Sequence, residues 1–323
     1  MKELGKVLVI KLGGVGEVVL AFPAFERIRQ AHPTAKITLL TTQPFESLAR
    51  SSPFFNNVES DGRPGNPAAW LGLVLRLRGA RYERIYDLQN DAGTNLIFQG
   101  LRPFAPAWSG TAMGASLPHR NPERGKMHQL ERQAEQLHAA GVWENAPTRP
   151  LSAAPPDISW ILARAERARF AVAGGQRPLV LLSPGESHGS PQKSWPIDRY
   201  AELAQRLNDA GYDIVIIGAL HESPLAHAIQ RKAHRARDLT GRTDFAQIAA
   251  LGARAALAIG NDTGALHLIA AAGAPTIGLF SAASDPAVSG PRGHVTVLQS
   301  PDLKDLPAET VAHAALALAQ QPA

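Results

Sequence analysis

One short segment of the chain combines a helix start with side chains that can hold an anion. Residues 255–280 read AALAIGNDTGALHLIAAAGAPTIGLF: a buried strand, NDTG, a helix, a glycine stop and a second strand. Asp262 and Thr263 are types that favour a helix N-cap, and such an N-terminus offers N–H groups and a positive dipole end. Thr263 and Gly264 add a hydroxyl donor and close backbone approach, and His267 lies one turn after Thr263. The segment predicts a phosphate site; the alternative is a plain capped helix with a partly buried histidine.

Two further segments carry polar groups just after predicted strands. In LLSPGESHGSPQKSWP, residues 181–196, Ser183 ends a strand and Lys193 stands just before a Trp-Pro helix entry. Lysine is a point charge suited to a phosphate oxygen. Glu222 follows the strand in IVIIGALHES, where an acidic side chain can accept hydrogen bonds from ribose hydroxyls. Ligands of open α/β sheets bind at the carboxyl ends of the strands, so these segments together predict a nucleotide-diphosphate site.

A glycine-rich turn opens the chain. Residues 7–25 read VLVIKLGGVGEVVLAFPAF, a strand, a turn containing Gly13, Gly14 and Gly16, and a helix that starts at Glu17. The glycines can simply permit a tight turn, and Glu17 can simply favour the positive end of the helix dipole. The alternative is a functional turn in which the carboxylate of Glu17 takes part in chemistry.

This turn does not match the two common nucleotide motifs. When G-x-G-x-x-G is laid on Gly14, the third glycine falls on Val19, and no ribose-binding acid follows the next strand. No G-x-x-x-x-G-K-[ST] string occurs anywhere in the chain. A carboxylate at Glu17 would also repel a phosphate. The turn therefore indicates neither a dehydrogenase nor a P-loop enzyme.

The elements that must position these residues alternate between strand and helix. In the N-terminal half, apolar runs and periodicity predict strands at 7–11, 37–41 and 84–88 and helices at 18–31, 43–50, 68–78 and 127–140, the last stopping at Gly141. Residues 103–126 are rich in Pro and Gly, and we expect a long loop there.

The composition changes at ENAPTRPLSAAPPD, residues 144–157, which we interpret as a linker. Beyond it the alternation restarts, with helices at 158–172, 197–210, 223–234, 245–251, 265–272 and 309–319, and strands at 179–183, 213–218, 256–259, 276–280 and 295–298. Two successive βαβ series predict two doubly wound α/β domains, residues 1–157 and 158–323.

Composition narrows the class of protein. The chain has 323 residues and no cysteine, which excludes disulfides, thiolate zinc sites and a cysteine nucleophile and fits a cytoplasmic enzyme. No apolar run is long enough to span a bilayer, and the MKELGK start lacks the features of a signal peptide. The net charge of +5 suits anionic partners, although it can also be a charge balance without meaning. The chain has no run of Lys and Arg interleaved with aromatic residues, a pattern that would indicate nucleic acid binding.

At these motifs the chain resembles glycosyltransferase family 9, the ADP-heptose:lipopolysaccharide heptosyltransferases, which have the GT-B fold. The resemblance covers nearly the whole chain. It lies in KLGGVGE with Pro23, in PG…KSWP, in DLTGRT at 238–243 and, with high specificity, in NDTGALHLIAAAGAPTIGLF. Glu17 stands where the family has Asp, and glycines replace its serines. The resemblance implies two Rossmann-like domains facing a cleft, with the acceptor in the first and the donor in the second. It also allows the last helix to cross back onto the first domain.

The resemblance also implies roles for individual residues. The implied donor-binding set is Gly14, Ser183, Lys193, Glu222, Asp262, Thr263, Gly264 and His267, with Glu222 on the ribose. The implied catalytic residues are Glu17, as general base, and Lys193, which stabilises the leaving ADP. We expect inversion of configuration and no metal or other cofactor, since the family needs none and no D-x-D motif lies beside the donor site.

The acceptor implied by the resemblance is an anionic glycolipid, the inner core of lipopolysaccharide, met at the inner membrane surface. The segment PHRNPERGKMHQLER supplies Arg120, Arg124, Lys126 and His128, followed by Arg132, as candidates for its anionic groups. The alternative for this segment is a solvated helix entry. Two other functions stay open: a family 9 enzyme with a different nucleotide-sugar or acceptor, and a nucleotide-sugar-binding protein without turnover.

Overall fold

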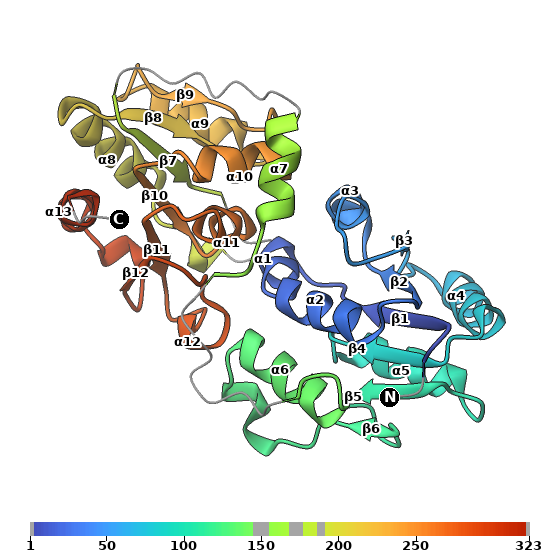
Figure 1. The fold of residues 1–323 in the computed structure, drawn as a ribbon. Helices are drawn as coiled ribbons and strands as arrows, with labels where there is room; N and C mark the ends of the chain where they lie inside the picture. Colours follow the sequence, from blue (N-terminus) through green and yellow to red (C-terminus); the bar gives the residue numbers. More distant parts are fainter. Residues whose placement is uncertain (1–2, 145–154, 168–176, 186–190, 321–323) are drawn as a thin grey trace. The chain divides into compact units, whose positions relative to one another are not determined.

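The computed structural model describes residues 3–144, 155–167, 177–185 and 191–320 (Figure 1). The chain divides into two compact units, Met1–Ser152 and Ala153–Ala323, called the first and second unit below. Most of the predicted linker, residues 145–154, lies outside the described residues, as do residues 168–172 of the helix predicted at 158–172. Each unit contains one parallel sheet with its own helices.

The first sheet has six parallel strands in the order β3-β2-β1-β4-β5-β6. They are β1 (Lys6–Ile10), β2 (Lys36–Leu40), β3 (Asn57–Glu59), β4 (Arg84–Asp87), β5 (Ala107–Gly110) and β6 (Leu117–Pro118). The apolar side chains of β1 are fully buried, as expected for a central parallel strand covered on both faces. The order reverses direction between β1 and β4, and this switch point is where doubly wound sheets bind ligands.

The predicted helix at 18–31 is two helices, α1 (Val15–Val19) and α2 (Phe22–Ala31). The break has a local cause: Pro23 lacks the N–H that a continuous helix would direct at the carbonyl of residue 19. The remaining helices of the first unit are α3 (Glu46–Arg50), preceded by a short 3₁₀ turn η1 (Gln43–Phe45), α4 (Pro67–Ala80), α5 (Ala92–Leu101), the 3₁₀ turn η2 (Pro122–Lys126) and α6 (Gln129–Ala139). Gly141 follows α6 with a φ of 75°, which confirms the predicted glycine stop.

The prediction of a long loop at 103–126 is wrong. The segment contains β5 and β6, which extend the sheet from β4, together with η2. Short strands beside Pro and Gly carry little local signal, and their conformation comes from pairing with a neighbouring strand. Helix α5 was also not predicted, although Asp91 caps it through a capping box with Thr94, a pattern that the sequence contains.

The second sheet repeats the architecture, with the order β12-β11-β10-β7-β8-β9. Its strands are β7 (Leu179–Ser183), β8 (Asp213–Ile216), β9 (Arg237–Asp238), β10 (Leu257–Asn261), β11 (Thr276–Phe280) and β12 (Val295–Gln299). All neighbours run parallel, and the order reverses between β7 and β10. The helices are α7 (Ser159–Arg167), α8 (Ile197–Asp209), α9 (Ser223–Gln230), α10 (Phe245–Gly252), α11 (Gly264–Ala271), α12 (Pro286–Ser289) and α13 (Ala308–Ala319). The predicted doubly wound α/β class is therefore confirmed for both sheets.

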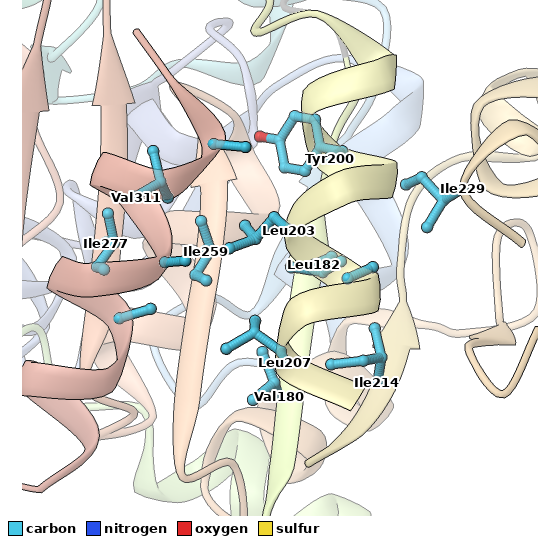
Figure 2. Packing of buried hydrophobic residues seen from close by; sticks show 14 of the residues in the cluster. Val180, Leu182, Tyr200, Leu203, Leu207, Ile214, Ile229, Ile259, Ile277 and Val311 are labelled. Carbon is cyan, nitrogen blue, oxygen red and sulfur yellow. The ribbon is translucent and has the colours of Figure 1, made fainter. Parts of the chain in front are cut away.

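A core of apolar side chains fixes α8 on this sheet (Figure 2). Leu203 and Leu207 of α8 point at Val180, Leu182 and Ile259 of the strands, and all of them are buried. The last helix packs here too. Its Val311, Ala315 and Leu318 belong to the same core, and α13 contacts α8 and β10. The last helix, which the resemblance allows to cross back onto the first domain, therefore buries its apolar face in the core of the second unit.

No helix within the described ranges has both the length and the apolar character needed to cross a bilayer.

Candidate functional site

The residues predicted to bind a diphosphate follow β7 and β10, the two strands at the switch point of the second sheet. Gly260 of β10 pairs with Ser183 of β7, so the segments that begin at Pro184 and at Asp262 leave the sheet side by side. A Cβ on Gly260 would come within 2.8 Å of the carbonyl oxygen of Ser183, so only glycine permits this close approach. The two sequence motifs therefore meet in one place.

Asn261 joins three segments of this site. Its side chain is fully buried, and its Oδ1 accepts hydrogen bonds from the Trp195 N–H at 3.1 Å and the Tyr200 hydroxyl at 3.0 Å. Its Nδ2 donates to the carbonyl oxygens of Pro184 and Gly185, each at 3.0 Å. Asn261 is not among the site residues predicted from the sequence, although it is the first residue of NDTG. It fixes the loop after β7 and the start of α8 relative to β10.

Lys193, Asp262 and His267 form a charged cluster at the start of α11. Lys193 Nζ lies 3.2 Å from Oδ2 of Asp262, and His267 Nε2 lies 3.8 Å from Oδ1. Burial acts to raise the pKa of Asp262, but the interactions with His267 and Lys193 outweigh it, so this pKa lies below the usual value. The lysine side chain is about one-quarter exposed, at 23%. The carboxylate therefore orients a cation whose remaining N–H groups can bind an anion.

Helix α11 begins without a side-chain cap. Thr263 is the N-cap residue with extended backbone, φ −126° and ψ 157°, but its hydroxyl makes no capping hydrogen bond. The hydroxyl instead lies 3.1 Å from that of Ser183. Gly264 is the first helical residue and, like Thr263, is partly exposed. The N-terminus of α11 thus presents backbone N–H groups beside Lys193, the arrangement that binds phosphate at helix starts.

Glu222 ends a 3₁₀ turn, η4 (Leu220–Glu222), that follows β8. Its Oε2 accepts a hydrogen bond of 2.7 Å from the Ala219 N–H. The carboxylate lies directly against Gly185, after β7, and Gly218, after β8, where any Cβ would clash with it. The carbonyl oxygen of Gly185 accepts a hydrogen bond from Asn261, the residue before Asp262. Glu222 therefore lies one strand away from the charged cluster, along the same edge of the sheet.

A hollow of about 430 Å³ lies farther along this edge of the sheet, on the side of the charged cluster away from Glu222. It is formed by the residues next to Lys193 and by the segments after β11 and β12, and is lined by Gln192, Ser194, Ser281, Ala282, Ala283, Pro301, Asp302 and Lys304. Along the edge, the order is therefore Glu222, the cluster at α11, and the hollow.

Glu17 and Gly14 belong to the first unit and lie at the start of α1. Oε2 of Glu17 is 2.6 Å from Nζ of Lys11, the residue after β1. The lysine side chain is 2% exposed, whereas that of Glu17 is 43% exposed. A Cβ on Gly13 would overlap the Glu17 carboxylate, so this glycine makes room for the ion pair. Gly14 is the N-cap residue of α1, and nothing lies within 4 Å of the position its Cβ would occupy.

Burial lowers the pKa of Lys11, although the Glu17 carboxylate acts in the opposite direction and Arg132 adds to the lowering. Asp87 ends β4, the strand paired with β1 at the switch point, and it is fully buried. Burial raises the pKa of Asp87 to about 6, against the effect of the hydrogen bonds that its carboxylate accepts from the backbone of Asn90 and Gln89. Neither Lys11 nor Asp87 was named as a site residue from the sequence. A charged residue at the carboxyl end of a buried strand is the signal that could have found both.

The four predicted acceptor residues do not form one exposed patch. Arg120 and Lys126 are exposed, and Lys126 is 2.8 Å from Glu123. Arg124 is partly buried: it contacts the His119 ring and donates to the carbonyl oxygen of Arg132 at 3.3 Å. Burial, and secondly the charge of Arg132, lowers the pKa of Arg124 to about 10. His128 is buried, and its Nδ1 accepts from the Leu130 N–H at 3.3 Å, so it caps α6.

Comparison with known proteins decides the family. The family model described as "Glycosyltransferase family 9 (heptosyltransferase)" matches residues 70–310. The chain belongs to glycosyltransferase family 9. It is therefore a glycosyltransferase, and the predicted GT-B fold with two parallel-sheet domains is confirmed.

Several of the similar proteins are named heptosyltransferases. The chain is 27% identical over 318 residues to lipopolysaccharide heptosyltransferase 2 of Escherichia coli, covering 90% of this chain and 86% of the relative. The solved structure of E. coli ADP-heptose lps heptosyltransferase II superposes with a TM-score of 0.76 at 23% identity, covering 97% of this chain and 98% of the other. The E. coli heptosyltransferase WaaC with ADP gives 0.72 at 22% identity, covering 96% and 98%.

Proposed function

We propose that this family 9 enzyme transfers a heptose from ADP-heptose to an anionic acceptor of the lipopolysaccharide-core type. The observation that carries the proposal is the cluster of Lys193, Asp262 and His267 at the uncapped start of α11. The choice of ADP and heptose is supported by the names of the relatives, among them an ADP-heptose lipopolysaccharide heptosyltransferase.

The proposed diphosphate position is at the start of α11, within reach of Lys193. The helix N–H groups and the ammonium group supply positive charge, and the Ser183 and Thr263 hydroxyls supply donors. In this proposal Asp262 orients Lys193 and His267. Its carboxylate does not contact the phosphates, because the two negative charges would repel each other. Positive charge from protein groups at the leaving diphosphate is the basis on which we propose transfer without a metal ion.

The rest of the donor follows from the order of strands along the sheet edge. The ribose hydroxyls bind the carboxylate of Glu222, on the β8 side of the diphosphate. The sugar then lies on the opposite side, toward the hollow of about 430 Å³ beside Lys193. An extended nucleotide-sugar bound along this edge would place its ribose at Glu222, its diphosphate at the start of α11 and its sugar at the hollow.

Glu17 is the proposed general base. Lys11 holds its Oε2, while its Oε1 has no hydrogen-bond partner among the described residues and is available to the acceptor. The acceptor O–H bond breaks, its proton passes to Glu17, and the oxygen attacks the anomeric carbon. The bond from that carbon to the diphosphate oxygen breaks with its electron pair, ADP leaves as an anion stabilised by Lys193, and the configuration inverts.

The acceptor proposal rests on charge. The first unit has 18 Lys and Arg against 13 Asp and Glu, whereas the second has 15 of each, so the whole net charge of +5 lies in the first unit. Arg120 and Lys126 are exposed in it and can meet phosphates or carboxylates of an inner-core glycolipid. A family 9 transferase for a different nucleotide-sugar is the competing function.

A screen of nucleotide-sugars tests the proposal. We expect ADP and ADP-heptose to raise the melting temperature of the full chain more than UDP-, GDP- or CDP-sugars at equal concentration. ADP release should then require an inner-core acceptor. Stronger stabilisation by a different nucleotide-sugar would show that ADP-heptose is not the donor. ADP release at the same rate with and without the acceptor would contradict the acceptor proposal.

A further inference from the structure

Helix α4 has an apolar outer face that the described residues of the first unit leave exposed. Its Leu73, Val74 and Leu77 are buried in the core, at 1–3% exposure. Leu71 and Leu75, one turn apart on the opposite side, are 52% and 56% exposed. A surface helix normally carries polar residues on its outer side, so a helix that is apolar on both sides requires a second apolar environment.

Two exposed side chains on loops, Phe104 and Met113, extend this face. The loop with Phe104 is attached to α4 by Arg78, which donates a hydrogen bond of 2.7 Å to the carbonyl oxygen of Arg102. Phe104 comes two residues after Arg102 and is 90% exposed. The Arg102 guanidinium lies against Gly114, next to Met113, which is 86% exposed. We call Leu71, Leu75, Arg78, Arg102, Phe104 and Met113 the α4 surface; α4 and α5 are labelled in Figure 1.

The charge of this region is positive and unpaired. Arg78, Arg81 and Arg102 are all exposed, and none has an acidic partner within the described part of the chain. The nearby Glu59 and Asp61 are already paired with Arg76 of α4. The surface thus offers apolar side chains rimmed by arginines, in the unit that carries the whole net charge.

We propose that the α4 surface docks on a lipid bilayer with anionic headgroups. A bilayer supplies an apolar layer for Leu71, Leu75, Phe104 and Met113 and phosphates for the arginines. A second copy of the chain fits less well, because a two-fold interface would bring the same arginines against one another. The inference deepens the proposed function, in which the acceptor is a glycolipid, by naming the surface that reaches the membrane holding it.

Vesicle binding of the full chain, without donor or acceptor, tests the inference. The vesicles are phosphatidylcholine alone, or phosphatidylcholine with about one-third phosphatidylglycerol. We expect binding to the mixed vesicles at least about tenfold tighter than to phosphatidylcholine, and weaker in high salt. The double variant Leu75→Gln with Phe104→Ser should lower the partition coefficient by roughly tenfold or more.

Matched controls separate this surface from general stickiness. Arg102→Gln should reduce the preference for phosphatidylglycerol, whereas Leu220→Gln and Arg254→Gln, at exposed positions of the second unit, should bind like the wild type. Melting temperatures check that each variant is folded. Absent binding, equal binding by the α4-surface variants, or equal loss in the controls would overturn the inference. A dimer that Leu75→Gln with Phe104→Ser dissolves, with no vesicle binding, would assign the surface to a second copy. None of these outcomes depends on nucleotide binding, which tests the proposed function separately.

Discussion

Lys11 and Glu17 form an ion pair in which the lysine is almost completely buried and the carboxylate is open to solvent on one side, with 2.6 Å between Nζ and Oε2. The lysine comes from the end of β1 and the glutamate from the start of α1, so the pair spans the opening turn. Gly13 leaves the space it needs. The ion pair holds one carboxylate oxygen of Glu17 in place, and the proposed function assigns the acceptor to the other oxygen.

Replacing Glu17 by Gln tests the proposed base. The change keeps size and polarity but removes the proton acceptor, so kcat should fall by roughly 10²–10⁴-fold while ADP affinity stays nearly unchanged. Glu17→Asp should retain partial activity. The variant keeps a carboxylate, but its side chain is one methylene shorter and fits the position set by Lys11 less well. The measurement is steady-state turnover with both substrates saturating. A Glu17→Gln enzyme as fast as the wild type, with chemistry rate-limiting, would leave Glu17 as a helix-start residue only.

Lys193 and Asp262 are expected to act together on ADP. Lys193→Ala removes the ammonium group, and Asp262→Ala leaves that group without its 3.2 Å partner. Lys193→Ala should weaken ADP binding by on the order of 1.5–3 kcal/mol, the usual value of a hydrogen bond to a charged group. Asp262→Ala should weaken ADP binding indirectly, because the ammonium group stays but is no longer oriented. Titration calorimetry measures the affinities, with Lys232→Ala, an exposed lysine of the same unit, as the control. Unchanged affinity in both variants would move the diphosphate to a different site.

Arg120 and Lys126 are the exposed members of the predicted acceptor set. Neutralising both to Gln should raise the acceptor KM several-fold, as expected when roughly one kcal/mol of charge attraction is lost. ADP affinity should not change. Arg124 is left intact in this test, because its buried contacts with His119 and Arg132 make a loss of stability the expected result of replacing it. If KM stays constant, the two residues are ordinary surface.

Transfer should not need a divalent cation. Lys193 and the start of α11 supply positive charge at the proposed diphosphate position, so activity should survive excess EDTA. The assay is ADP release before and after chelation. Activity that EDTA abolishes and magnesium or manganese restores would contradict the metal-free mechanism.

Asp87 should make stability depend on pH. Its pKa is about 6 in the folded chain, against 3.8 for an unperturbed aspartate, so between these values the folded state binds the extra proton. Stability therefore falls as pH rises through this window, by at most about 3 kcal/mol, because one pKa unit corresponds to 1.36 kcal/mol.

Asp87→Asn removes this titration while keeping an oxygen for the backbone N–H groups of Asn90 and Gln89. Relative to the wild type, the variant should gain stability between about pH 4 and pH 7. Lys11 and Arg124 lose an anionic neighbour, which reduces the gain. Denaturation curves at several pH values measure the difference. A difference that does not change with pH would show that Asp87 is not protonated in the folded chain.

Sequence alone determined the alternation of strands and helices wherever the signal is local. The apolar runs of β1, β7 and β11 are buried on both faces and can be recognised without their neighbours. The same holds for the motifs: NDTG and KSWP carry the residue types that a helix start and a phosphate partner require, so Lys193, Asp262, Thr263 and His267 could be named together. The short strands β5 and β6 at one end of the first sheet could not be recognised, because their hydrogen bonds come from β4 and from each other.

Tertiary structure decided which of these groups meet. Asn261 was passed over in the sequence because its partners, Pro184 and Trp195, are 66 to 77 residues away. Helix α13 was free in sequence to pack on either domain, and the burial of Val311 and Ala315 settles it in the second unit. His128, one of the predicted acceptor residues, is buried and accepts a hydrogen bond from the Leu130 N–H at the start of α6. In each case a local pattern specifies what a side chain can do, whereas its partner is set by contacts between distant segments that form only when the sheet is assembled.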